Sequence, residues 1–216
     1  MRPGARVIEA VLWDYGGVFS GSPFEAMAGV AREMGVDPQR YLEIVFGPYD
    51  HDTDHPWHRL ERGEIPLAVA RAEIQDLGRR EGIDSDPFHL FGAMSRGGGG
   101  PRSAVVEFAR ELKGAGLRSA LVTNNAVEFR AFWRRSIPLD ELFHCVIDSS
   151  EVGLRKPDPR IFELALGRLG VPAARAVFLD DYAGNVEAAR RVGMRGVLVT
   201  DDYAAALAEL GRLLGR

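Results

Sequence analysis

Cysteine and lysine are two residue types that this chain nearly lacks. Cys145 is the only cysteine, which excludes an internal disulfide and favours a cytoplasmic location. It stands in an apolar strand pattern at 143–147, so we interpret it as a small buried hydrophobe rather than a nucleophile. Among the 27 basic residues, only Lys113 and Lys156 are lysine. Because arginine is used almost everywhere else, a lysine indicates a place where a compact ammonium group is needed.

The chain also lacks long apolar runs, a basic excess and a secretory leader. Its longest apolar runs have the length of a strand, which excludes a membrane-spanning helix. The net charge of −4 provides no basic field for nucleic acid. Residues 1–6 show neither an apolar leader core nor a cleavage signature, so we expect no signal peptide. With 46% hydrophobic residues among 216, the chain can bury the core of one large domain, or of a domain with an insertion.

The first ordered segment predicted is a strand that ends in a sharp glycine turn. Ile8 and residues 11–13 are apolar and partly β-branched, as in a buried strand. Asp14 follows, and Gly16-Gly17 then allows backbone angles that side chains forbid. Asp14 thus stands at the carboxyl end of a strand, where open α/β sheets bind their ligands. Taken alone, it could equally well cap a loop.

Residues 21–96 contain no strand pattern and predict a small helical subdomain. Apolar residues at helical spacing predict helices over 22–35, from 37 through 45, from 64 through 74 and over about 87–94, with a loop at 48–56. Arg96 and four glycines, Gly97–Gly100, come next and cannot pack, so we interpret them as a hinge back to the first domain. The predicted division is a core domain of residues 1–20 and 97–216 with a helical cap at 21–96.

From residue 102 onward, helix and strand patterns alternate. Strands are predicted at 119–122, 145–148, 176–179 and 196–199, separated by helices at 105–115, 129–135, 159–169 and 186–192 and followed by one at 203–214. Strands that alternate with helices form parallel sheets. The predicted fold is therefore α/β, with a Rossmann-like parallel sheet of about five strands flanked by helices.

Polar residues follow three of these strands, and the carboxyl ends of parallel strands share one edge of the sheet. These residues are Asp14, Thr123-Asn124 and Asp180-Asp181. Lys156 opens a helix after a fourth strand and can reach the same edge. Three aspartates this close cannot all stay ionised without compensation, and one lysine supplies only part of it. A divalent cation would balance the remaining negative charge, and carboxylate, carbonyl and water ligands favour Mg²⁺.

Each of these residues also has a purely structural interpretation. Thr123-Asn124 and Asp180-Asp181 could cap the helices that follow them. Lys156 could be a surface cation, although lysine is rare in this chain. Asp158 we do interpret as a helix N-cap. The joint occurrence of these groups at strand ends favours a catalytic role over a purely structural one.

Taken together, four motifs resemble those of the haloacid dehalogenase superfamily over nearly the whole chain. They are Asp14-Tyr15-Gly16-Gly17-Val18, Leu121-Val122-Thr123-Asn124-Asn125, Lys156-Pro157-Asp158-Pro159 with Phe162, and Phe178-Leu179-Asp180-Asp181 with Asn185 and Gly193. The helical insertion resembles the C1-type cap of that superfamily. Its segment 57–65 resembles the branch that includes sugar-phosphate phosphatases and the amino-terminal phosphatase domain of soluble epoxide hydrolases.

The resemblance implies a Mg²⁺-dependent phosphatase acting on a small phosphorylated metabolite, with no nucleic-acid or membrane partner. Asp14 would be the nucleophile and form an aspartyl-phosphate. By the same resemblance, Asp14, the Gly16 carbonyl and Asp181 would bind the metal, with Asp180 beside them. Thr123 and the backbone N–H groups around Asn124 would hold phosphoryl oxygens, and Lys156 would neutralise charge on Asp14 and on the phosphoryl group.

One position departs from the superfamily pattern. Gly16 stands where most of its phosphatases carry a second Asp that acts as general acid and base, a role worth about 10²–10⁴-fold in rate. A substitute acid could come from the loop 50–58, which holds His51, His55 and His58 beside three aspartates. A second metal site there is another possibility. The alternative interpretation is a solvated polar loop.

Two other functions stay open at this point. A 2-haloacid dehalogenase shares the nucleophilic Asp and the Lys, but needs no metal and lacks the paired acids seen at Asp180-Asp181. A fold retained for binding or regulation, with catalysis lost through Gly16, is the other alternative. The sequence does not identify the substrate or the oligomeric state.

Overall fold

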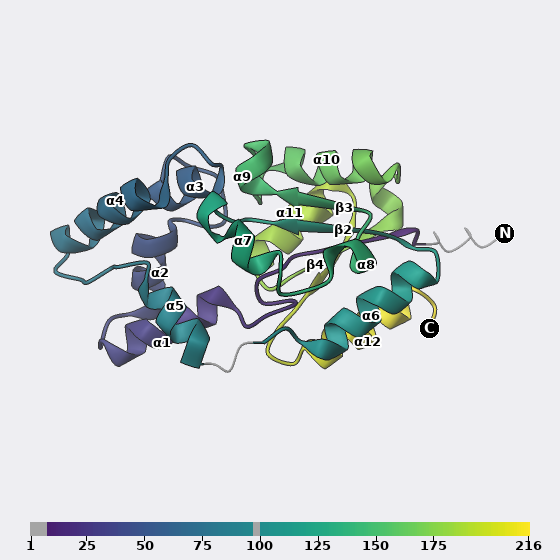
Figure 1. Ribbon diagram of the computed structural model, residues 1–216, viewed down its shortest axis with the longest axis horizontal. Helices are drawn as coiled ribbons and strands as arrows, with labels where there is room; N and C mark the ends of the chain where they lie inside the picture. Colours follow the sequence, from purple (N-terminus) through teal and green to yellow (C-terminus); the bar gives the residue numbers. More distant parts are fainter. Residues whose placement is uncertain (1–7, 97–99) are drawn as a thin grey trace.

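The computed structural model describes residues 8–96 and 100–216, and a five-stranded parallel sheet forms its centre (Figure 1). The strands are β1 (Ala10–Trp13), β2 (Arg118–Thr123), β3 (Cys145–Asp148), β4 (Ala176–Asp180) and β5 (Arg195–Leu198). Their order across the sheet is β3-β2-β1-β4-β5. Trp13 at the end of β1 pairs with Leu121 of β2 and with Leu179 of β4. The strand that leads to Asp14 is therefore the central one, with the other motif-bearing strands on both sides.

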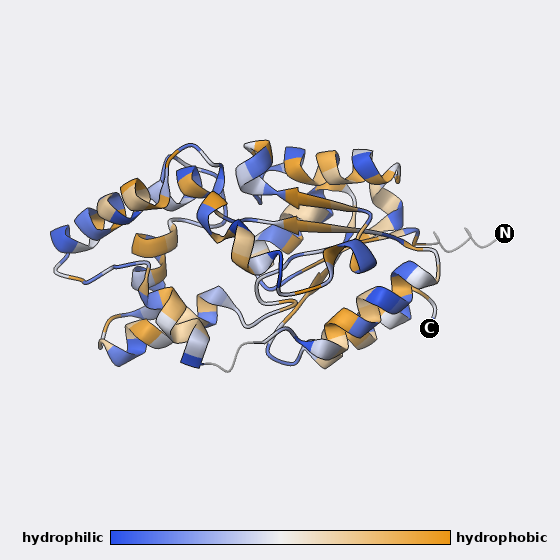
Figure 2. Ribbon diagram, in the orientation of Figure 1, coloured by the Kyte–Doolittle hydropathy of each residue, from blue (hydrophilic) through white to orange (hydrophobic). Residues whose placement is uncertain are grey.

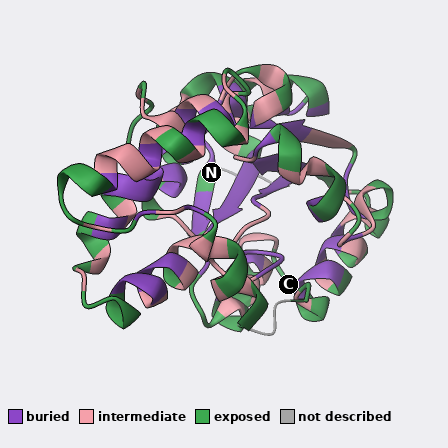
Figure 3. Ribbon diagram, turned by 60° about the vertical axis from the view of Figure 1, so that its left-hand side comes forward, coloured by how far each residue is buried: buried purple, intermediate pink, exposed green. Residues whose placement is uncertain are grey.

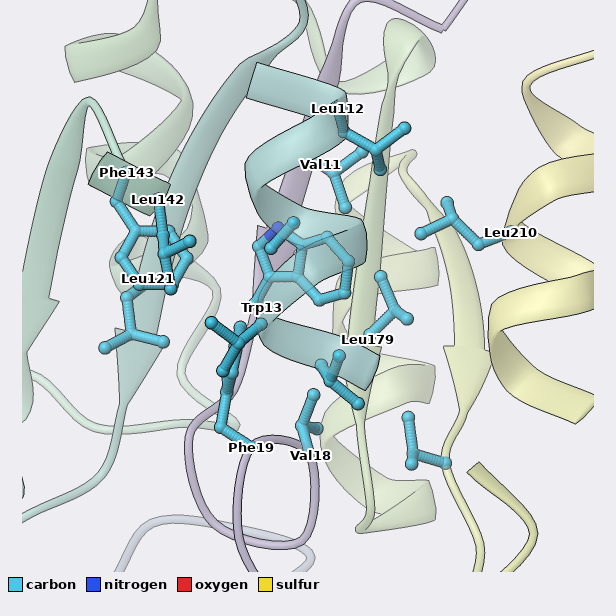
Figure 4. Packing of buried hydrophobic residues seen from close by; sticks show 14 of the residues in the cluster. Val11, Trp13, Val18, Phe19, Leu112, Leu121, Leu142, Phe143, Leu179 and Leu210 are labelled. Carbon is cyan, nitrogen blue, oxygen red and sulfur yellow. The ribbon is translucent and has the colours of Figure 1, made fainter. Parts of the chain in front are cut away.

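Helices cover both faces of the sheet because successive side chains of a strand point to opposite faces. Val11 and Trp13 of β1 face a core completed by α6 (Ser103–Gly114), α7 (Arg130–Trp133), α8 (Leu139–Leu142) and α12 (Tyr203–Leu213), shown around Trp13 in Figure 4. Ala10 and Leu12 face a second core built with α10 (Pro159–Leu169) and α11 (Ala183–Val192). Figure 2 shows the strands as mainly hydrophobic, and Figure 3 shows them buried.

A helical subdomain lies at one end of the sheet, on the left in Figure 1. It consists of α1 (Pro23–Glu33), α2 (Pro38–Phe46), α3 (Pro56–Glu61), α4 (Leu67–Arg80) and α5 (His89–Arg96). Met27, Tyr41, Leu60 and Ile74 belong to its own buried cluster. This cluster gives the segment a core separate from those of the sheet.

Most expected elements are present, and the predicted fold class is confirmed. Ser22 and Asp158 accept backbone N–H groups as N-caps of α1 and α10. The sequence prediction missed α3, which has six residues and an unusual imidazole N-cap from His55. It also missed two four-residue helices, α8 and α9 (Ser149–Val152). Such short helices carry too few apolar positions to show a helical period.

Three further expectations can be set against the structure. Cys145 begins β3 and is half-buried rather than fully buried, because that strand lies at the edge of the sheet. Gly97–Gly99, the centre of the expected hinge, lie outside the described residues. The division into a core of residues 1–20 and 97–216 and a cap at 21–96 stays a prediction. Within the part of the chain that the structure describes, no helix has the length and apolar character needed to cross a membrane.

Candidate active site

Three carboxylates meet at the carboxyl edge of the sheet. Asp14 directly follows β1, Asp180 is the last residue of β4, and Asp181 comes next. One carboxylate oxygen from each lies within 4.8 Å of those of the other two. Asp180 is completely buried, and Asp14 is only 8% exposed. The neighbouring parallel strands β1 and β4 thus place three acids in a small, largely dry volume.

Lys156 supplies the cation nearest to two of these acids. Its Nζ lies 2.6 Å from Asp14 Oδ1 and 2.7 Å from Asp180 Oδ2. Its side chain is 1% exposed, which makes the ammonium a buried partner and not a surface charge. Burial acts to lower the pKa of Lys156, but the charges of Asp14 and Asp180 outweigh it and raise that pKa above its ordinary value.

The remaining negative charge calls for a further cation. Burial and the neighbouring Asp180 charge outweigh Lys156 and raise the pKa of Asp14 to about 7. Burial, followed by the charges of Asp180 and Asp14, raises the pKa of Asp181 well above its usual range. Carboxylates in this situation either hold a proton or bind a metal ion. Hard oxygen donors in a cluster of this size fit a divalent cation such as Mg²⁺.

Asp180 is the acid with the most internal hydrogen bonds. It accepts hydrogen bonds from the Tyr182 backbone N–H at 2.8 Å and from Asn185 Nδ2 at 3.1 and 3.2 Å, in addition to the bond from Lys156. Asn185 lies in the first turn of α11, five residues after Asp180, so the helix itself brings it back to the carboxylate. These bonds fix Asp180 as a support for Lys156 and leave Asp14 and Asp181 better placed to bind a metal.

Gly16 and Gly17, which follow Asp14 and Tyr15, have different surroundings. Gly17 has a φ of +67°, and a Cβ there would lie 2.1 Å from Asp181 Cγ. Only glycine fits this close approach to the acidic cluster. At Gly16, a Cβ would lie 3.3 Å from Pro23 Cδ. The Cβ of an acid at position 16 would therefore lie closely against the start of α1.

Asn124 uses its side chain to hold Lys156 in place. Its Oδ1 accepts the Lys156 backbone N–H at 2.7 Å, and its Nδ2 donates to the Lys156 carbonyl at 2.9 Å. Thr123, the last residue of β2, is 2% exposed, and its hydroxyl makes only a long 3.4 Å bond to the Asn124 carbonyl. The structure thus brings every residue predicted for the site to one edge of the sheet, and gives the amide of Asn124 a positioning task.

Comparison with known proteins agrees with this geometry. The family model of the haloacid dehalogenase-like hydrolases matches residues 57–193, which is more than half of the chain. The chain belongs to the haloacid dehalogenase-like hydrolase family.

Two relatives and one solved structure illustrate the range of the matches. The chain is 30% identical to mouse acyl-CoA dehydrogenase family member 10 over 98% of its own length but only 20% of that protein. It is also 30% identical to the sesquiterpene phosphatase astK of Aspergillus oryzae, over 96% of this chain and 97% of that one. A HAD family enzyme from Bacteroides thetaiotaomicron, crystallised with magnesium and inorganic phosphate, superposes with a TM-score of 0.61 at 16% identity, covering 92% and 98% of the two chains.

In this hydrolase the site also involves residues whose role the sequence did not suggest. Ser22, the N-cap of α1, donates its hydroxyl proton to Asp181 Oδ2. Arg102, the N-cap residue of α6, donates to the Gly17 carbonyl and lies over the ring of Tyr203 at 4.8 Å. The sequence does not reveal the contact of Ser22 with Asp181, because a serine fits the N-cap position whether or not its hydroxyl also reaches the acidic cluster.

The histidine-rich loop proves to be largely structural. His55 Nδ1 accepts the Trp57 backbone N–H at 3.2 Å, and His58 Nδ1 accepts that of Thr53 at 3.0 Å. Burial is the main cause that lowers the pKa of His55 to about 4 and that of His58 to about 2. Both imidazoles are therefore neutral near pH 7 and hold no proton to deliver at that ring nitrogen. His51 alone of the three is exposed, paired with Asp50 at 2.7 Å.

Proposed function

We propose that this hydrolase is a Mg²⁺-dependent phosphatase that cleaves a small phosphorylated metabolite through an aspartyl-phosphate on Asp14. The observation that carries the proposal is the cluster of buried Asp14 and Asp180 with partly buried Asp181, in which Lys156 Nζ lies 2.6 Å from Asp14 Oδ1. Its excess negative charge fits a divalent cation, and its paired acids on β4 separate it from the metal-free dehalogenase chemistry. The likeness to a sesquiterpene phosphatase over nearly the full length of both chains supports it as well.

Asp14, Asp181 and the Gly16 carbonyl would hold the Mg²⁺ ion, with Asp180 beside them. Bound there, the ion would offset carboxylate charge and draw electron density from a phosphoryl oxygen. Lys156 would hold one Asp14 oxygen through its ammonium group and leave the other oxygen free to react. The Thr123 hydroxyl and the backbone N–H groups around Asn124 would donate to the phosphoryl oxygens.

The reaction then proceeds in two displacements on phosphorus. The free oxygen of Asp14 attacks, a bond from that oxygen to phosphorus forms, and the ester bond to the alcohol oxygen breaks. The departing oxygen keeps the electron pair and takes a proton from solvent water, because Gly16 provides no acid. A water molecule next attacks the same phosphorus and frees Asp14. One water is consumed, and the alcohol and inorganic phosphate are released.

Hydrolysis of p-nitrophenyl phosphate with and without Mg²⁺ tests this proposal. The substrate has a good leaving group and therefore does not need the missing acid. We expect Mg²⁺-dependent turnover that falls by about 10³-fold or more in Asp14→Asn, because the nucleophile is removed. Asp140→Asn, an exposed aspartate on α8, is the control and should retain turnover.

The opposite results are equally informative. Turnover that survives in Asp14→Asn would contradict the proposed nucleophile. Absence of turnover with Mg²⁺, combined with metal-free release of chloride from 2-chloropropionate, would identify a dehalogenase instead. A cytoplasmic location, expected from the single cysteine, stays a prediction that fractionation of the native host would test.

A further inference from the structure

A cavity of about 290 Å³ adjoins the acidic cluster where the helical subdomain meets the sheet. Gly17, Ser22 and Asp181 line it on the side of the cluster. The cavity therefore begins at groups that touch the reaction centre proposed above. Asp181, one of the three clustered acids, connects the cavity to the site where a phosphoryl group would bind.

Four residues of the lining offer mainly apolar side chains. Phe24 and Leu42 contribute from the helical subdomain, and Tyr182 and Val199 contribute from the sheet side. Phe24 and Tyr182 stack with ring centroids 5.1 Å apart, and Tyr49 meets both rings edge-on at 4.9 and 5.3 Å. An aromatic wall thus joins the two parts of the molecule beside the site.

Exposed acidic residues also line the cavity. They are Glu25 on α1 and Asp201 after β5, and exposed Thr200 precedes Asp201 in the lining. Among the described residues, Arg102 is the one basic residue in the lining. Its Nη1 donates to the Gly17 and Val18 carbonyls, and its guanidinium lies over the face of Tyr203. An anionic group on a substrate would meet the carboxylates of Glu25 and Asp201 there, and only one guanidinium, which already binds these carbonyls.

From this lining we propose that the preferred substrates are phosphate monoesters of apolar alcohols that carry no second anionic group. The inference rests on the phosphatase function proposed above and adds the class of leaving group. An apolar alcohol gains from burial against Phe24, Leu42 and Tyr182. A polyhydroxylated alcohol would leave hydroxyl groups without partners against the same wall, which costs affinity. A second anionic group would be repelled by Glu25 and Asp201.

A panel of three esters of primary alcohols tests the proposal, assayed with Mg²⁺ beside p-nitrophenyl phosphate. The panel is 2-phenylethyl phosphate, glucose 6-phosphate and propane-1,3-diol bisphosphate. We expect kcat/KM for 2-phenylethyl phosphate to exceed each of the other two by about 10-fold or more, the range that one apolar pocket provides. Preference for glucose 6-phosphate or the bisphosphate would overturn the proposal.

Two variants locate the selectivity in the cavity. Leu42→Gln should lower the ratio of kcat/KM for 2-phenylethyl phosphate to that for glucose 6-phosphate about 5-fold, since part of the apolar wall is lost. Val69→Gln, at a 40% exposed site on α4 that does not line the cavity, is its control and should leave the ratio as it is. An equal ratio in the two variants would contradict the assignment of the cavity.

A matched pair of variants on α1 tests the effect of the acidic residues that line the cavity. Glu25→Gln should raise the ratio of kcat/KM for the bisphosphate to that for 2-phenylethyl phosphate about 3-fold, because one repelling charge is removed. Glu33→Gln removes the same charge at the other end of the helix, away from the cavity, and should leave this ratio unchanged.

If p-nitrophenyl phosphate itself is not hydrolysed, the phosphatase function fails. If it is hydrolysed while the panel shows no apolar preference, only the leaving-group proposal fails.

Discussion

Arg155 of the sheet domain and Glu61 of α3 form a buried ion pair that joins the helical subdomain to the active site. Arg155 Nε lies 2.7 Å from Glu61 Oε2, and the two side chains are 0% and 4% exposed. Glu61 Oε1 also accepts hydrogen bonds from Tyr49 at 2.5 Å and Trp57 at 2.9 Å. Because Arg155 directly precedes Lys156, the pair ties the position of the helical subdomain to the loop that carries the site's ammonium group.

Glu61→Gln should destabilise the protein much more than loss of an exposed ion pair. The substitution leaves Arg155 as a buried charge without its main partner, which costs about 3–5 kcal/mol. Glu73→Gln is the control, since Glu73 pairs with Arg59 at 3.3 Å where the side chains are 42% and 34% exposed. That exposed pair is worth at most about 1 kcal/mol. Urea unfolding of both variants measures the difference, and equal losses of stability would show that the buried pair contributes no more than the exposed one.

Acid should destabilise this protein through His58. The imidazole is completely buried, and its pKa of about 2 in the folded chain lies below the ordinary value of 6.5. Between these two values the unfolded chain binds a proton that the folded chain does not. Stability is therefore unaffected by this group above about pH 6.5 and falls as the pH drops below it. At pH 5 the loss is about 2 kcal/mol for one such histidine.

Urea unfolding at pH 7 and at pH 5 measures this effect. His58→Gln should be less stable than the natural chain at pH 7, because the Thr53 contacts change, but should lose less stability on acidification. His51→Gln, whose imidazole is 61% exposed, should keep the full pH dependence. A pH dependence that is the same in His58→Gln as in the natural chain would refute the assignment to His58.

The sheet and the place of the acids could be predicted because both follow from local patterns. Apolar strands, their alternation with helices and polar residues at strand ends are all visible within a few neighbouring residues. The rarity of lysine also helped, because it marked the two positions where a compact ammonium group is used. Lys156 forms the ion pairs of the site, and Lys113 donates to the carbonyls of Asp140 at 2.6 Å and Phe143 at 2.8 Å. Each lysine serves as a compact donor with several close acceptors.

Contacts between the helical subdomain and the sheet domain could not be predicted from the same patterns. Glu61 and Arg155 are 94 positions apart in the chain, and their pairing depends on how two separately packed units meet. The Ser22 contact with Asp181 and the space that Pro23 takes beside Gly16 have the same origin. The histidine-rich loop was open to a catalytic interpretation because composition does not reveal that His55 and His58 already accept backbone N–H groups.

Gly17→Ala should abolish Mg²⁺-dependent activity, and Gly82→Ala should not. The two glycines have nearly the same φ, +67° and +71°, so a side chain costs a similar amount of backbone energy, about 1–2 kcal/mol, at either position. A Cβ at Gly17 would collide with Asp181, whereas at Gly82 nothing lies within 4 Å. Thermal unfolding and p-nitrophenyl phosphate turnover of both variants separate backbone strain from damage to the site. Full turnover in Gly17→Ala would rule out a metal-binding role for Asp181 in its present position.

Ser22→Ala should weaken Mg²⁺ activation about 10-fold, beyond its effect on stability. Ser22 caps α1 and also donates to Asp181, so its removal frees a carboxylate that the hydroxyl orients toward the cluster. Asp37→Ala removes the N-cap of α2, which accepts the Arg40 backbone N–H at 2.8 Å. Each substitution should cost about 1 kcal/mol of stability as a lost cap. The Mg²⁺ concentration for half-maximal turnover should rise in Ser22→Ala only, and a rise of equal size in Asp37→Ala would trace the effect to the helix cap and not to the Asp181 contact.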